Sequence, residues 1–60
     1  MREQLIALGT RIKMARKERK MTLQTLADRT GLTAGLLSKI ENFRTIPSLP
    51  VLVDIAAALE

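Results

Sequence analysis

The stretch that decides the fold is residues 22–42, TLQTLADRTGLTAGLLSKIEN. Apolar residues recur in it at helical spacing on both sides of Gly31, without the sustained apolar–polar alternation of a strand. Thr22 and Thr33 are of a type that caps helix N-termini, because the hydroxyl accepts from an amide of the next turn. Gly31 tolerates the left-handed conformation of a sharp turn. The pattern predicts two short helices, from residue 23 to 29 or 30 and from 34 to 41 or 42.

This pair of helices has the signature of a helix-turn-helix unit, which we assign to residues 23–42. Ala27 is predicted at the crossing point, where a larger side chain would push the helices apart. Four apolar residues are expected to hold the second helix against the first: Leu26, Leu32, Leu37 and Ile40. The second helix is left with a bare face of small or polar residues: Thr33, Ala34, Gly35, Ser38, Lys39 and Asn42. Such a face fits the major groove of duplex DNA, where the N-terminal residues of the helix reach base edges.

Two further helices are predicted on either side of this unit. The first covers about residues 3–19 and has one apolar stripe, formed by Leu5, Leu8, Ile12 and Ala15. Gly9 lies inside it and weakens the helix by about 1 kcal/mol relative to Ala. The last helix begins after a third cap, Ser48, and tolerates Pro50 in its first turn. Its expected apolar stripe is Leu49, Leu52, Ile55, Ala56 and Leu59. The sequence therefore predicts an all-α bundle of four helices, in one domain over residues 1–60.

Composition excludes several kinds of chemistry. The chain has 60 residues and contains neither Cys nor His. It therefore lacks a thiol nucleophile, a thiolate zinc site and the usual general base. A domain this small rarely builds a closed pocket around its carboxylates. We expect no enzymatic activity, no metal site and no cofactor. No apolar run approaches the roughly 20 residues of a membrane span.

Charge is concentrated at the start of the chain. Residues 1–20 carry seven basic and two acidic side chains, whereas residues 21–60 carry three basic and four acidic ones. This distribution favours an anionic partner, with nucleic acid ahead of a membrane surface. A membrane-surface helix is the weaker reading, because the apolar stripe of residues 3–19 lacks Trp and Phe and is needed for the core.

The residues that carry a family resemblance extend over nearly the whole chain: 8–12 (LGTRI), 22–33 (TLQTLADRTGLT), 37–42 (LSKIEN), 47–49 (PSL) and 55–59 (IAAAL). In them the chain resembles the Cro and lambda-repressor-like helix-turn-helix family, of the xenobiotic-response-element type. It is similar in particular to the N-terminal domain of bacterial regulators that carry a cupin sensor domain. The resemblance implies a lambda-repressor-like bundle whose fifth helix is truncated here. It also implies a longer regulator, with any effector bound by a C-terminal domain that is missing from residues 1–60.

The function implied by the resemblance is sequence-specific binding of double-stranded DNA by a prokaryotic transcriptional regulator. The helix of about residues 34–41 would enter the major groove, the protein would be a homodimer, and it would be cytoplasmic and associated with the nucleoid. The alternative is a protein-interaction module, antitoxin-like or coactivator-like, that kept the fold. Such a module would use the face of residues 34–42 or the exposed end of the last helix on another protein.

The resemblance also implies roles for individual residues. The positions that face base edges are Ala34, Gly35, Ser38 and Lys39. The positions near phosphates are Arg11, Lys13, Thr22, Thr33, Asn42 and Arg44. Arg16 and Glu41 match a pair that forms a salt bridge between the first and third helices. Because Ala34 and Gly35 have no side-chain donor or acceptor, direct readout would depend on a thymine methyl against Ala34, on Ser38, and on Lys39 at guanine O6 or N7. DNA shape would supply further specificity.

The chain departs from the family pattern at Ala34 and Gly35, where members often have Gln, Asn or Arg, and at two further positions. Phe43 stands where the family usually has Gly after the loop-entry Asn42, and Glu60 stands where a Gly usually follows the last helix.

Overall fold

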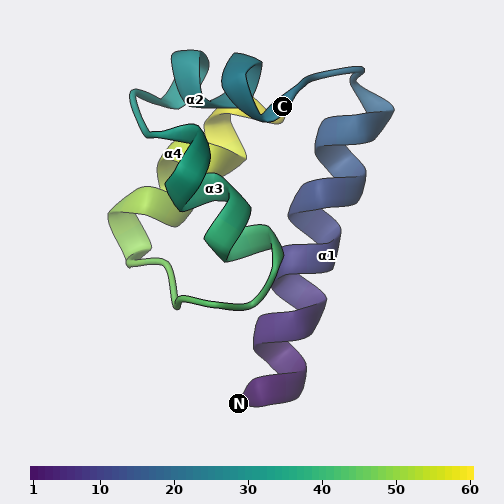
Figure 1. Cartoon of the computed structure of the whole chain (residues 1–60), viewed down its shortest axis with the longest axis vertical. Helices are drawn as coiled ribbons and strands as arrows, with labels where there is room; N and C mark the ends of the chain where they lie inside the picture. Colours follow the sequence, from purple (N-terminus) through teal and green to yellow (C-terminus); the bar gives the residue numbers. More distant parts are fainter.

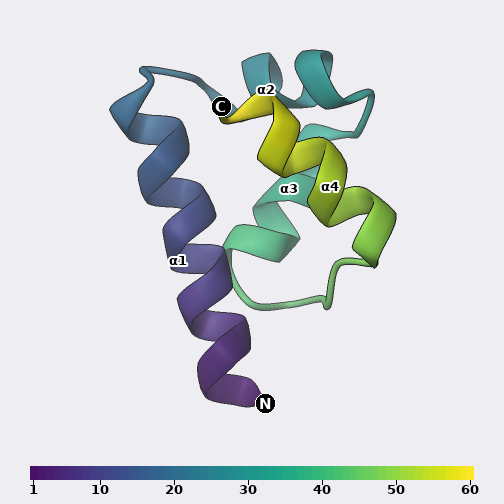
Figure 2. The same cartoon turned by 180° about the vertical axis from the view of Figure 1, so that it is seen from behind.

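The computed structural model describes residues 1–60 and contains four α-helices (Figure 1). They are α1 (Arg2–Glu18), α2 (Leu23–Thr30), α3 (Ala34–Glu41) and α4 (Leu49–Ala58). Helix α3 packs against α1 and α2, and α2 also packs against α4. Helix α4 lies on the face turned away from the viewer in Figure 1, as the view from behind shows (Figure 2). The predicted all-α bundle of four helices, with bounds within one residue of those expected for the first three, is confirmed.

The three predicted N-caps are confirmed. Thr22 and Thr33 each accept a hydrogen bond from the backbone N–H three residues further on, at 3.0 and 3.1 Å. Ser48 does the same at 3.4 Å. In each case the side-chain oxygen satisfies an amide that the first turn of a helix leaves without a partner. These caps set where α2, α3 and α4 begin.

A residue in left-handed conformation follows each of the first three helices within two residues of its end. Gly31 has φ 73°, the left-handed conformation predicted for it. Lys20 and Phe43 have φ 56° and 63°, although this conformation is unfavourable for residues that carry a Cβ. After α3, the backbone N–H groups of Phe43 and Arg44 donate to the carbonyl oxygens of Ile40 and Lys39, at 3.3 and 2.8 Å. This is the hydrogen-bond pattern of a Schellman motif, which normally has Gly at the position that Phe43 occupies.

The core lies between α2, α3, the second half of α1 and the middle of α4. Its buried apolar residues are Ile12, Met21, Leu26, Ala27, Leu37, Ile40 and Ile55. All but Met21 were expected from their spacing. Met21 lies in the turn between α1 and α2, outside any helical stripe, so periodicity could not identify it.

The predicted apolar stripe of α4 was partly wrong. Leu49 is 74% exposed and Ala56 is also exposed, whereas Ile55 is buried. The residues of α4 packed against the core are centred on Ile55 and include Val51, Leu52, Ala58 and Leu59. Positions three and four residues from Ile55 share its side of the helix, but Ala56 is turned about 100° away from it. The helix is therefore rotated relative to the stripe chosen from sequence.

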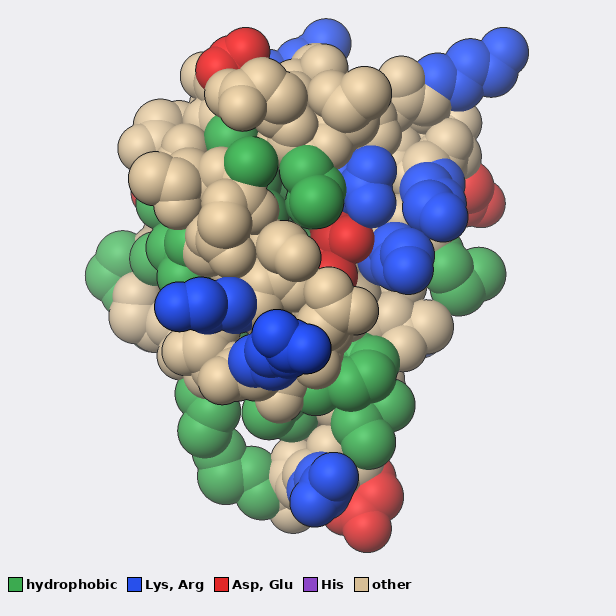
Figure 3. Space-filling model, in the orientation of Figure 1, with side chains coloured by type: hydrophobic (Ala, Val, Ile, Leu, Met, Phe, Trp, Pro, Cys, Tyr) green, Lys and Arg blue, Asp and Glu red, His purple; other side chains and the backbone are tan.

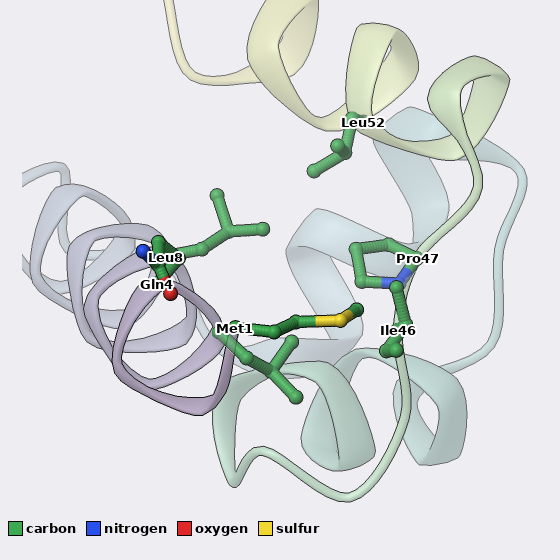
Figure 4. Close-up of a pocket in the computed structure, with 7 residues that line it drawn as sticks. Met1, Gln4, Leu8, Ile46, Pro47 and Leu52 are labelled. Carbon is green, nitrogen blue, oxygen red and sulfur yellow. The ribbon is translucent and has the colours of Figure 1, made fainter.

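A hollow of ≈ 170 Å³ lies between the start of α1, the loop after α3 and α4 (Figure 4). Its lining is formed by Met1, Gln4, Leu5, Leu8, Ile46, Pro47 and Leu52, and Gln4 is the polar residue among them. Packing is thus less complete at this end of the molecule than around α2 and α3. No helix of the structure combines the length and the apolar character needed to cross a membrane.

Candidate nucleic-acid interface

Helix α3 is held by one side and open to solvent on the other. Leu37 and Ile40 are completely buried and fix its rotation against α1 and α2. The predicted base-facing residues divide into exposed Gly35 and Lys39 and half-buried Ala34 and Ser38. A Cβ built on Gly35 would meet no heavy atom within 4 Å, so the backbone of the first turn is open to close approach. The helix thus exposes a surface of small, mostly polar side chains.

Two helix N-termini flank this surface. Thr22 and Thr33, the caps of α2 and α3, are both exposed. Neither helix has an acidic residue in its first turn. The partial positive charge of each helix start is therefore not compensated by a carboxylate, which is the condition under which helix N-termini attract phosphate.

A buried ion pair fastens the C-terminal end of α3 to α1. Arg16 Nε donates to Glu41 Oε2 at 2.8 Å, and its Nη2 donates to Oε1 at 3.0 Å. Arg16 Nη1 donates to the carbonyl oxygen of Met21 at 2.8 Å. Arg16 is 7% exposed and Glu41 is 4% exposed. These bonds tie α1, the turn after it and α3 together.

The contact with Glu41 favours the charged form of Arg16. The hydrogen bonds to the Glu41 carboxylate raise the pKa of the Arg16 guanidinium above its usual value; desolvation by burial opposes the rise, and the opposite charge adds to it. The stability linked to a raised cation pKa is present below the unfolded-state value and lost only above it. Because that window is strongly alkaline, Arg16 keeps its charge at neutral pH. The pair leaves no free carboxylate from Glu41 beside α3.

The predicted phosphate-contacting residues of α1 do not share one side of the helix. Lys13 follows Gly9 by four residues and precedes Arg16 by three, so it lies on the side that packs against α3. Arg11 is turned about 200° from Lys13. It lies nearer the side of Leu8, which lines the hollow beside α4. The structure brings Lys13 towards α3 and leaves Arg11 on the other side of α1.

The basic side chains nearest to α3 are grouped on the face shown in Figure 3. One group lies beside α1 and a second lies over the lower end of α3 and the loop that follows. Lys39 and Arg44, at that lower end, are both exposed. Glu41, the acidic residue of α3, is paired with Arg16. The face around α3 is therefore positively charged.

Asn42, predicted to approach phosphate, is the C-cap of α3 and uses its amide within the helix. Its Nδ2 donates to the carbonyl oxygen of Ser38 at 2.8 Å and to the Ser38 Oγ at 3.3 Å. Sequence reasoning treated the two residues separately. Their four-residue spacing on a helix is a signal that could have linked them.

Gly9 also has a role that sequence reasoning missed. It is buried, and a Cβ on it would lie 2.7 Å from the carbonyl oxygen of Ile40 and 2.8 Å from a ring carbon of Phe43. Gly9 thus permits the close approach of α1 to the end of α3. The helix-weakening residue seen in the sequence is the point of closest packing between the two helices.

Comparison with known proteins agrees with this arrangement. The family model described as helix-turn-helix matches residues 12–60. An immunity repressor protein of Bacillus phage phi105 is 44% identical over 54 residues, which cover 90% of this chain and 38% of the repressor. The transcriptional regulator SinR of Bacillus subtilis is 41% identical over 54 residues, covering 88% of this chain and 49% of SinR. The chain thus spans about half or less of the length of these curated relatives. No solved structure gives a significant match.

Proposed function

Because the chain belongs to the Cro and lambda-repressor-like helix-turn-helix family, we propose that it binds double-stranded DNA with α3 in the major groove. The relatives are named as a repressor and a transcriptional regulator, and we extend regulation of transcription to this chain. A sensor domain outside residues 1–60, of the cupin type or another, remains a prediction. The proposed activity is binding and not catalysis.

The observation that carries the proposal is the bare side of α3. Its eight residues make a rod about 12 Å long, and the major groove of B-DNA is about 12 Å wide. The buried side is clamped by α1 and α2, so the helix need not rearrange to enter the groove. A surface with no bulky side chain at Gly35 lets the first turn approach the base edges.

Within the groove, Lys39 is the residue proposed to read a guanine through O6 or N7. Ala34 would contact a thymine methyl, and Ser38 would hydrogen-bond to a base edge. Gly35 would contribute only close backbone approach. With few side chains able to read bases, sequence-dependent DNA shape would supply part of the specificity.

Phosphates would be bound on both sides of α3. On one side we place Lys13 and the N-termini of α2 and α3, with their caps Thr22 and Thr33. On the other we place Arg44. Arg11 was predicted to belong to this set, but its position across α1 from Lys13 argues against a contact on the same duplex face. We therefore use Arg11 as a matched basic control.

We also propose that the chain binds as a homodimer, with two half-sites about one helical turn apart. Support within the chain comes from the exposed apolar side chains at the start of α4, of which Leu49 is 74% and Val53 58% exposed. The same residues could receive a different protein, as the alternative function requires. Salt-insensitive binding to a protein, with no affinity for any duplex, would favour that alternative.

The proposal is tested by selecting binders from a random duplex pool and titrating them at several salt concentrations. With Lys13 and Arg44 of two chains neutralising about four phosphates, log K should fall against log salt with a slope of about −4. Lys39→Ala should relax the preference at one base pair. The binding stoichiometry should be two chains per duplex. A chain that enriches no sequence from the pool would contradict the proposed function.

Lys13→Ala and Arg11→Ala form a matched pair for the phosphate contacts. Lys13→Ala should weaken binding to every duplex alike and, because two chains bind, make the salt slope shallower by about 2. Arg11→Ala removes the same charge from the other side of α1 and should leave the slope unchanged. Equal losses from the two substitutions would show that only net charge matters, and would overturn the assignment of Lys13.

A further inference from the structure

The side-chain amide nitrogen of Asn42 is engaged with Ser38. It donates to the Ser38 carbonyl oxygen at 2.8 Å and to the Ser38 hydroxyl oxygen at 3.3 Å. A backbone carbonyl can only accept, so it is the nitrogen of the amide, and not its oxygen, that faces Ser38. What Asn42 presents to solvent is its carbonyl oxygen, which a phosphate would repel.

The bond from Asn42 also determines how the Ser38 hydroxyl can interact. A hydroxyl has one hydrogen to donate and two lone pairs to accept with, and Asn42 occupies one lone pair. Serine and threonine in helices often donate to the carbonyl four residues earlier. Thr30 does so in α2, where its Oγ1 donates to Leu26 O at 2.8 Å. The contact of the Ser38 hydroxyl within the chain is instead the bond that it accepts from Asn42, which leaves its hydrogen and one lone pair for another partner.

From this geometry we infer that Asn42 is a positioning residue, which orients the Ser38 hydroxyl toward a base edge and does not itself contact phosphate. The inference rests on the proposed function, and it names the residue on which one base contact of α3 depends. The hydrogen of Ser38 can be donated to purine N7, guanine O6 or thymine O4. Its second lone pair can accept from the amino group of adenine or cytosine.

The test compares the wild-type chain with Ser38→Ala, Asn42→Ala and the double variant. Each is titrated against the selected duplex and against duplexes with the other three base pairs at each position of the half-site. Gln24→Ala is the matched control. It removes another exposed amide that bonds at four-residue spacing, Gln24 Nε2 to Asp28 Oδ1 at 2.9 Å, but on α2 and without Ser38. Circular dichroism of each variant verifies that the helices are retained.

We expect Ser38→Ala and Asn42→Ala each to reduce discrimination at the same base pair by about two- to tenfold. The double variant should discriminate no worse than Ser38→Ala alone, because Asn42 acts through Ser38. The salt slope should stay constant in all of them. Gln24→Ala should keep the wild-type preference at that base pair.

Three results would overturn the inference while leaving the proposed function intact. Asn42→Ala could weaken all duplexes equally, with no change in base preference, which would make Asn42 a phosphate contact. Asn42→Ala could leave every affinity unchanged. The two single variants could alter different base pairs, which would separate Asn42 from Ser38. Failure of the wild-type chain to bind any duplex would overturn both the proposed function and this inference.

Discussion

Replacing Arg16 with Ala should destabilise the fold by about 3–5 kcal/mol, because it leaves the buried Glu41 carboxylate without a partner. The substitution removes both hydrogen bonds to Glu41 and the bond to the Met21 carbonyl oxygen. A domain of this length is stable by only about 3–9 kcal/mol in total. Urea denaturation followed by circular dichroism should therefore find Arg16→Ala largely unfolded, or with a much lower midpoint.

A double replacement distinguishes an unpaired charge from the loss of packing. In Arg16→Met with Glu41→Leu, neither charge remains and the volume is nearly kept. Buried ion pairs can often be exchanged for apolar residues with little loss, so the double variant should regain most of the stability that Arg16→Ala loses. A denaturation midpoint of Arg16→Ala equal to that of the wild type would mean that the pair does not stabilise the fold.

Replacing Gly9 with Ala should also destabilise the fold, although Ala is the better helix former. The new Cβ would lie 2.7 Å from the carbonyl oxygen of Ile40, a backbone atom held in α3. It would also press on the ring of Phe43, at 2.8 and 2.9 Å. Overpacking of this kind typically destabilises by about 1–3 kcal/mol, and the gain in helix propensity of about 1 kcal/mol offsets only part of it. We expect a net loss of up to about 2 kcal/mol in the free energy of unfolding.

Gly35→Ala is the matched control for this prediction. It makes the same change inside a helix, but its Cβ would meet nothing within 4 Å. Gly35→Ala should therefore stabilise the fold by about 0.4–1 kcal/mol. If both substitutions stabilise the chain to a similar extent, α1 does not approach α3 as closely as the structure describes.

Local chemistry explains why much of the fold could be predicted from sequence. The caps Thr22, Thr33 and Ser48 act on backbone amides three residues away, so a short stretch of sequence contains both partners. Gly31 is needed for the left-handed backbone conformation of one residue, which does not depend on distant contacts. The buried stripe of α2 and α3 follows from a period of 3.6 residues, and these two helices are too short for the stripe to drift.

Features that depend on contacts between helices could not be read in the same way. The need for glycine at position 9 arises only because the end of α3 packs against it. The buried side of α4 likewise depends on how that helix is rotated against the core. Leu49 and Ala56 were misplaced for this reason. The strained turn at Phe43 was visible as a departure from the family pattern, but its conformation was not.

Site residues were predicted from the family resemblance, one position at a time. The structure adds which of them lie on the same side of a helix and which do not. Lys13 and Arg11 received the same role although their spacing places them on different sides of a helix. Asn42 and Ser38 received independent roles although four-residue spacing allows them to interact. In both cases helical geometry adds information that a position-by-position comparison leaves out.

The entry of α3 into the major groove is tested most directly by methylating guanine N7, an atom exposed in that groove. Affinity of the wild-type chain would be measured for the selected duplex, with one guanine methylated at a time. We predict strong loss of binding at one or more guanines within each half-site, the one read by Lys39 among them, and no loss at guanines outside the site. Binding that tolerates N7 methylation at every guanine, and is instead displaced by a minor-groove ligand, would contradict the account.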